Sequence, residues 1–287
     1  MIGEPEVLRL PAGGIVDLPG RGEVFVRDSG PHPGSPPLLL LHGWTATADL
    51  NWHACYPHLD RHRVLAFDHR GHGRGLRGNE PFTLEAAADD AAALLETLGT
   101  GPVIATGYSM GGPVAQLLWK RHPHLVSGLV LCATAAVFTG RLSERATFAA
   151  FPSAIAMARV LPAQLRLRAA MRLMAGSDSW ELRQWACDQI SSHDWVRILE
   201  AGQAIGRFDS RPWIRDVDVP TAVVVTLNDR IVVPERQLAL AAAIRGARLN
   251  ESRGDHSVVL SSPELFVPPL LDAVAGVRAR LAPPSAA

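Results

Sequence analysis

The sequence predicts an α/β fold with a mostly parallel central sheet that is flanked by helices. Short apolar runs alternate along the chain with longer stretches whose apolar residues recur at helical spacing, a pattern typical of strands joined by crossover helices. The alternation stops after residue 135 and resumes at residue 221, and the patterns in between are helical. We therefore expect a core made of residues 1–135 and 212–287, with a helical cap inserted at 136–211.

The elements of the first half of the chain can be assigned in order. Residues 38–41 are all leucine and end at His42, as expected of a strand that is buried on both faces. Thr83 precedes alanines and leucines at helical spacing, and its hydroxyl can cap the first turn of a helix. We expect strands at 6–10, 22–28, 38–41, 64–67, 103–106 and 126–132, and helices at 83–98 and 111–121.

The elements of the second half follow the expected insertion. Pro234 favours the first turn of a helix, where its missing N–H is not needed. The last residues, from 282 to 287, are small or proline and are expected to be disordered. We expect strands at 221–226 and 247–251, and helices at 234–244 and 263–281.

The composition argues against several classes of function. The 28 Lys and Arg residues balance 28 Asp and Glu residues, so nothing indicates a nucleic-acid partner. No apolar run reaches the roughly 20 residues that span a bilayer, and the N-terminus lacks a signal-peptide pattern. Cys55, Cys132 and Cys187 match neither a zinc site nor a redox pair. We expect a cytoplasmic protein that acts on a small molecule without a metal or cofactor; its oligomeric state is not indicated.

Residues 107–112 read Gly-Tyr-Ser-Met-Gly-Gly and match the nucleophile-elbow pattern G-x-S-x-G. A strand is expected before this segment and a helix after it, so the turn at Ser109 must be tight. Side chains two positions before and two after the serine would collide there, which explains the small residues at Gly107 and Gly111. The strained turn would expose the serine hydroxyl at a helix N-terminus. We therefore predict that Ser109 is a nucleophile.

A serine hydroxyl needs a base, and His256 is the best-placed histidine. It directly follows the last expected strand, and in such sheets functional groups emerge at the carboxyl ends of strands. It also comes late in the chain, after the nucleophile, as this type of triad requires. The histidines of other loops, which are His69, His72, His122 and His124, are expected to be solvated or to cap helices.

The base in turn needs a carboxylate that fixes its tautomer and stabilises its cation. Asp229 follows the strand expected at 221–226 and precedes a helix that begins with proline, which places it well. Asp216 and Asp218 come before that strand, at the wrong end of the sheet. Asp255 is the neighbour of the histidine in sequence, and adjacent side chains rarely face one another. We therefore assign the acid to Asp229.

Acyl transfer also needs two N–H groups that point to the oxygen on which negative charge develops. One is expected from the backbone of Met110, directly after the nucleophile. The other is expected from the loop that follows residues 38–41, where the backbone N–H of Trp44 is the candidate.

These segments together resemble the α/β-hydrolase superfamily, over residues 38–135 and from 220 to about 259. The nearest likeness is to esterases and lipases that carry a helical cap. The resemblance implies an α/β-hydrolase fold, and it implies that residues 68–73 form a structural turn beside the site. It rests on His42-Gly43-Trp44, residues 68–73 (Asp-His-Arg-Gly-His-Gly), residues 107–112, Asp229 and His256.

A serine at the elbow favours acyl chemistry, because relatives that resemble dehalogenases or epoxide hydrolases carry an aspartate there. We expect hydrolysis of carboxylic esters of small, largely apolar substrates through an acyl-enzyme. Acyl transfer, perhydrolysis and cleavage of a carbon–carbon bond by the same triad remain alternatives. A different class also remains open, a small-molecule receptor or scaffold, because fold does not settle function.

The expected cap is rich in bulky apolar side chains, some of which would line the space above Ser109 and select the substrate. Flexible methionines suit an adaptable apolar wall. These residues are Phe138, Phe148, Phe151, Met157, Leu161, Leu165, Met171, Leu173, Met174, Trp180, Trp185 and Trp195.

Overall fold

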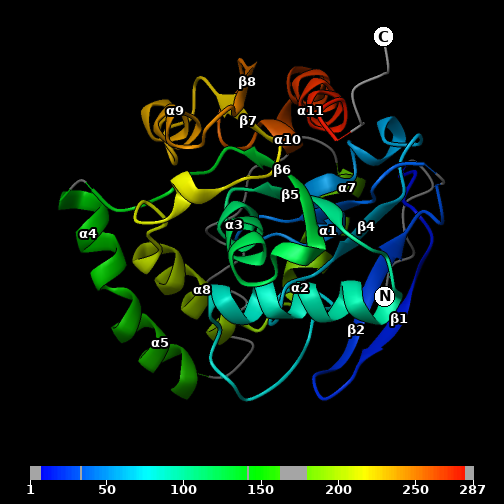
Figure 1. The fold of residues 1–287 in the computed structure, drawn as a ribbon. Helices are drawn as coiled ribbons and strands as arrows, with labels where there is room; N and C mark the ends of the chain where they lie inside the picture. Colours follow the sequence, from blue (N-terminus) through cyan, green and yellow to red (C-terminus); the bar gives the residue numbers. More distant parts are fainter. Residues whose placement is uncertain (1–7, 33, 141, 162–179, 282–287) are drawn as a thin grey trace, which may run out of the picture.

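The computed structural model describes residues 8–32, 34–140, 142–161 and 180–281 (Figure 1). Its centre is an eight-stranded sheet in the order β1-β2-β4-β3-β5-β6-β7-β8. Strand β2 is antiparallel to both of its neighbours, and all other neighbouring strands are parallel, which confirms the mostly parallel sheet. The strands are β1 (Gly13–Leu18), β2 (Gly22–Asp28), β3 (Leu38–Leu41), β4 (Val64–Phe67), β5 (Val103–Tyr108), β6 (Val126–Cys132), β7 (Thr221–Thr226) and β8 (Arg248–Ser252).

Helices cover both faces of the sheet. Their bounds are α1 (Ala48–Trp52), α2 (Leu84–Leu98), α3 (Gly111–Arg121), α9 (Pro234–Ala243), α10 (Val258–Ser261) and α11 (Pro263–Arg278), and the short 3-10 turns are η1 (Tyr56–His58), η2 (Pro123–Leu125) and η3 (Ile214–Asp216). Leu39 and Leu41 of β3 belong to an apolar cluster with α2, α3 and α9. Leu38 and Leu40 belong to the opposite cluster with α1, α10 and α11. Burial on both faces explains why β3 is apolar throughout.

The chain between β6 and β7 is helical where the structure describes it. It contains α4 (Leu142–Ala149), α5 (Phe151–Val160), α7 (Trp180–Ser191) and α8 (Trp195–Arg207), and α4 and α5 stand at one side of the sheet (Figure 1). Phe151 and Ile155 of α5 pack against Val196 of α8. An isolated antiparallel bridge joins Val137 to Asp209 at the base of the segment. Four of the apolar residues assigned to the cap lie outside the described residues: Leu165, Met171, Leu173 and Met174.

The first strand is the main error in the expected element order. It runs from Gly13 to Leu18, not over residues 6–10, and residues 8–10 are not in a strand. This strand lies at the sheet edge and is largely exposed, so its apolar pattern is weak, and its two leading glycines resemble a turn. Helix α1 was not expected, because a helix this short carries little periodicity. In the described part of the chain, no helix is both long enough and apolar enough to cross a membrane.

The parallel strands bring several loops to one edge of the sheet. The carboxyl ends of β3, β5, β7 and β8 are Leu41, Tyr108, Thr226 and Ser252, and parallel neighbours end on the same side. The loops that follow these strands contain every site residue predicted from the sequence.

Candidate active site

The turn between β5 and α3, residues 107–112, has the geometry of a strained elbow. Ser109 has a φ of 51°, in the left-handed region that residues other than glycine rarely adopt. Its N–H donates to the Cys132 carbonyl at 2.9 Å, and Thr134 Oγ1 donates to the Ser109 carbonyl at 2.8 Å. A Cβ atom on Gly107 would collide with the carbonyl of Gly111. The surrounding backbone therefore fixes the strained serine and requires glycine in the turn.

Hydrogen bonds connect the serine, the histidine and the aspartate in one chain. His256 Nε2 lies 2.9 Å from Ser109 Oγ, and His256 Nδ1 lies 2.7 Å from Asp229 Oδ2. A carboxylate can only accept, so Nδ1 carries the proton in this arrangement and Nε2 is free to accept the serine proton. Tyr108 donates its hydroxyl to the His256 carbonyl at 2.8 Å and so holds the histidine loop. The arrangement can activate the serine for nucleophilic attack.

Asp229 lies in a buried pocket that is rich in hydrogen-bond donors. Its Oδ2 accepts from Thr226 Oγ1 at 2.8 Å and from Gln237 Nε2 at 3.3 Å, in addition to the histidine. Its Oδ1 accepts from the N–H groups of Ile231 and Val232, both at 2.8 Å. A buried carboxylate requires such partners. These hydrogen bonds fix the carboxylate of Asp229 in the orientation in which Oδ2 faces His256.

The carboxylates that were rejected from the sequence have other partners. Asp255 is exposed and accepts from the N–H and the hydroxyl of Ser257, which lowers the pKa of this carboxyl. Asp218 accepts from Trp119 Nε1 at 3.1 Å. Asp216 lies in η3, before β7. Within the described chain none of them bonds the site histidine.

Both expected oxyanion donors lie near Ser109, because Met110 follows it in the chain and Trp44 lines the same cavity. Among the described residues, neither the N–H of Met110 nor that of Trp44 has a hydrogen-bond acceptor. The preceding N–H, that of Gly43, is used, because it donates to Asn51 Oδ1 at 2.9 Å. The position that a Cβ on Gly43 would take is 3.4 Å from Ser109 Cβ, so this loop lies directly against the serine. Two unused N–H groups beside a nucleophile are what an oxyanion requires.

The expectation that His69 and His72 are solvated or capping is wrong. Both are buried in a cluster of rings next to the site, whereas His122 is half-buried and His124 exposed. Burial lowers the pKa of every ring in the cluster, those of His69 and His193 to about 4. Within the described ranges, no group of His, Cys, Asp or Glu is arranged to hold a metal ion. The cluster consists of His42, His69, His72 and His193.

A cavity of about 530 Å³ opens beside Ser109. Its size is in the range of sites that bind small molecules. Apolar side chains contribute to its wall, among them Leu50, Ile231 and Leu260, and Arg230 lies at the same wall. The cavity therefore combines the nucleophile with a mixed but substantially apolar surface.

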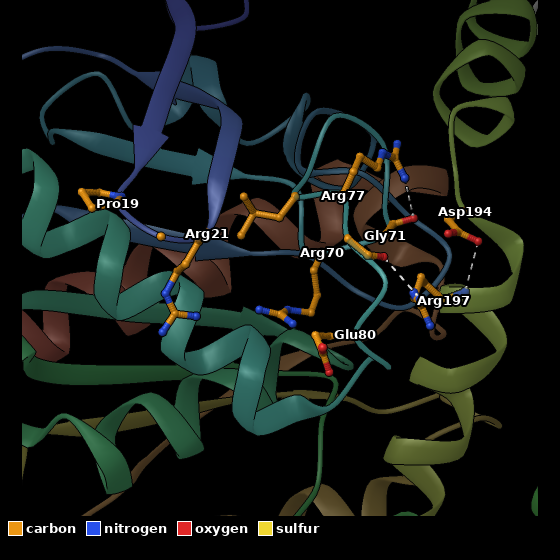
Figure 2. Close-up of a pocket in the computed structure, with 11 residues that line it drawn as sticks. Pro19, Arg21, Arg70, Gly71, Arg77, Glu80, Asp194 and Arg197 are labelled. Carbon is orange, nitrogen blue, oxygen red and sulfur yellow. Dashed lines mark hydrogen bonds between the residues drawn. The ribbon is translucent and has the colours of Figure 1, made fainter.

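A second cavity, of about 450 Å³, is lined by arginines and lacks a nucleophile with a base (Figure 2). Its guanidinium groups already have protein partners. Arg21 and Arg70 both bond Asp90, at 2.8 and 2.6 Å. Arg77 donates to backbone carbonyls, and Arg197 pairs with a glutamate of its own helix. The cavity beside the serine is thus the better candidate for an active site.

The sequence of this chain matches a known protein family. A family model described as an alpha/beta hydrolase fold matches residues 36–263, which include both oxyanion candidates and the serine, histidine and aspartate. The chain belongs to the α/β-hydrolase family. The α/β-hydrolase fold class predicted from the sequence is therefore confirmed.

Individual relatives of this α/β-hydrolase are enzymes. It is 30% identical over 257 residues to the pimeloyl-[acyl-carrier protein] methyl ester esterase of Neisseria meningitidis, covering 84% of this chain and 94% of that enzyme. It is 36% identical over 118 residues to Lipase LipV of Mycobacterium tuberculosis, covering 41% of this chain and 44% of the lipase. The solved enol-lactonase of Burkholderia xenovorans superposes with a TM-score of 0.74 and 25% identity, covering 91% of this chain and 100% of that one. The family and these relatives identify the protein as a hydrolase.

Several supporting residues were missed by the sequence analysis. Gln237 and Thr226 hold the aspartate, and Thr134 holds the elbow. A glutamine on the buried face of α9 was a usable signal, because a buried amide needs partners. The hydroxyls gave no such signal, since threonine is also an ordinary strand residue.

Proposed function

We propose that this protein is a serine hydrolase that cleaves carboxylic esters through an acyl-enzyme. Ser109 is the nucleophile, His256 the base and Asp229 the orienting acid. The observation that carries the proposal is the unbroken chain of hydrogen bonds from Asp229 to Ser109, ending at a serine in a strained elbow. The esterase, lipase and lactonase named above give independent support for ester chemistry.

In the first half of the reaction, Ser109 Oγ bonds to the carbonyl carbon of the ester while its proton passes to His256 Nε2. The carbonyl electron pair moves to oxygen, and the N–H groups of Trp44 and Met110 stabilise that charge. When the tetrahedral intermediate collapses, the alcohol leaves with the proton from His256. Asp229 stabilises the imidazolium between these steps.

In the second half, water takes the place of the alcohol. His256 accepts a proton from the water as its oxygen attacks the acyl carbon, and Ser109 leaves with that proton. The products are the carboxylic acid and the free enzyme, so atoms and protons balance without any further reactant.

We propose that the substrates are small and largely apolar, and that the helical segment at 136–211 acts as a cap that selects them. The cavity beside the serine has room for a small ester and apolar side chains along its wall. Trp44, which lines this cavity, also packs against Phe151 of α5, which supports the proposal because the segment contacts one residue of the cavity wall.

The test is to compare wild type with Ser109→Ala on short p-nitrophenyl esters and with a fluorophosphonate probe. Wild type should turn over many equivalents and should be labelled once, at Ser109. The variant should not be labelled, and its kcat should fall on the order of a million-fold by the protease precedent. Unchanged ester turnover in Ser109→Ala would refute the proposal, and stoichiometric binding without turnover in wild type would indicate a receptor.

A further inference from the structure

The loop between β3 and α1, residues 43–47, is held from outside by the junction of α7 and α8, residues 189–198. Thr47 Oγ1 donates to Gln189 Oε1 at 2.9 Å. Trp44 Nε1 donates to the Ile198 carbonyl at 2.7 Å. The partners are more than 140 residues apart in the chain. The loop that carries one proposed oxyanion donor is therefore attached to the helical segment.

Within this loop, Thr45 has a strained backbone. Its φ is 61°, in the left-handed region that is unfavourable for a branched residue. His193 Nε2 lies 3.2 Å from the Thr45 carbonyl oxygen, and His193 Nδ1 lies 2.8 Å from the N–H of Gly73. Because Nδ1 accepts from Gly73, the ring proton is on Nε2 and is donated to Thr45. One neutral histidine thus supports the strained residue next to Trp44.

The junction itself is fixed to the core on its other side. The N–H of Asp194 donates to the Gly71 carbonyl at 2.8 Å. Arg77 donates to the Ser192 carbonyl at 2.6 Å. These contacts lie at the edge of the arginine-lined cavity, where Figure 2 shows Arg77, Gly71 and Asp194 together. The residues on both sides of His193 in the chain are therefore bonded to the core, which allows His193 to fix the position of the Thr45 carbonyl.

We infer that His193 is a positioning residue for acyl transfer, which holds the 43–47 loop so that the Trp44 N–H points to the oxyanion. The inference rests on the proposed function. Without the bond from His193, Thr45 can relax to an ordinary φ, which changes the path of the 43–47 loop and so moves the Trp44 N–H away from the oxyanion. The helical segment then contributes to the rate of the chemical step, and not to substrate selection alone.

The test compares His193→Asn with His193→Gln. The asparagine amide can still accept from Gly73 but is too short to reach Thr45, whereas the glutamine amide extends to the position of Nε2 and can donate to Thr45. We expect His193→Asn to lower kcat by about ten- to a hundredfold, below the loss for complete removal of an oxyanion donor. We expect KM to stay within about twofold of the wild-type value, because the contact acts mainly in the transition state. We expect His193→Gln to recover most of the wild-type kcat.

A structural role alone would give a different pattern. If both variants lose the same activity and the same thermal stability, or if His193→Asn keeps the wild-type kcat, the inference is wrong. Trp44→Phe is a second variant, which keeps the aromatic packing on Phe151 but loses the donor to Ile198. It should also lower kcat, which is the readout for this variant because Trp44 lines the cavity and its replacement also affects KM.

The rate of fluorophosphonate labelling at Ser109 separates this inference from the proposed function. The phosphoryl oxygen uses the same N–H groups as the oxyanion. If wild type is labelled but hydrolyses no ester, the proposed ester chemistry fails while His193 can still be tested. A labelling rate in His193→Asn equal to that of wild type would then overturn the positioning role.

Discussion

The two sides of the site are held in different ways. Ser109, His256 and Asp229 lie on loops that follow core strands, and their supports come from the sheet and from the helices next to it. The 43–47 loop follows a core strand too, but His193 and Ile198 of the helical segment hold it. The comparison teaches that the proposed nucleophile is held by the sheet and its flanking helices, whereas the loop of one proposed oxyanion donor is also held by the segment between β6 and β7.

The largest effect is expected on the side held by the core. Asp229→Asn keeps the shape of the side chain but favours the wrong histidine tautomer, so kcat should fall on the order of 10⁴-fold. The control is Asp255→Asn, which removes an exposed carboxylate that bonds only Ser257 among the described residues. Steady-state kinetics on one ester gives the kcat of both variants. If Asp229→Asn keeps a nearly wild-type kcat while Asp255→Asn is inactive, the orienting acid is Asp255 and not Asp229.

Replacing a glycine by alanine should cost more unfolding free energy in the elbow than in the 43–47 loop. A Cβ at Gly111 would collide with the Leu41 carbonyl, whereas one at Gly43 would lie 3.3 Å from Asn51 Oδ1. Gly111→Ala should therefore lose about 3 kcal/mol or more of unfolding free energy, and Gly43→Ala about 1 kcal/mol. Urea denaturation of the two variants gives both numbers. Equal losses would show that the elbow is no more tightly packed than the loop.

A further effect is expected from acid, and it should reach the loop first. His69 and His193 have pKa values lowered to about 4 by burial, so the unfolded chain binds more protons between about pH 6.5 and 4. Stability should fall as the pH drops through this window, by up to about 1.4 kcal/mol per pH unit for each histidine. His69→Phe should flatten the slope of unfolding free energy against pH by about that amount. The prediction fails if the slope is unchanged.

Hydrogen exchange can locate the acid effect. The histidine cluster lies behind the 43–47 loop, where His42 donates to the Gly43 carbonyl at 2.8 Å and His193 bonds Thr45. Amide protons of residues 43–47 should therefore lose protection at a higher pH than those of residues 107–112. Simultaneous loss in both segments would mean that acid unfolds the site as one unit.

The sequence predicted most strands of the sheet and the candidate residues on the side of the site held by the core, because both predictions depend on local patterns. Apolar strand runs, the small residues around Ser109 and the position of His256 after a strand can be recognised within a few residues. The support of the 43–47 loop could not be predicted in this way. The contact between His193 and Thr45 joins residues 148 positions apart, and a loop histidine has no periodicity that would reveal it. The exposed first strand was missed because edge strands carry a weak apolar pattern.

The attachment of Trp44 to Ile198 has a consequence for protein engineering. Exchanging the segment between β6 and β7 with that of another hydrolase would remove Gln189, His193 and the Ile198 carbonyl from the 43–47 loop. Chimeras built at the strand ends should therefore have a lower kcat than wild type. A graft that ends before residue 189, and so retains residues 189–198, keeps the support of the native chain.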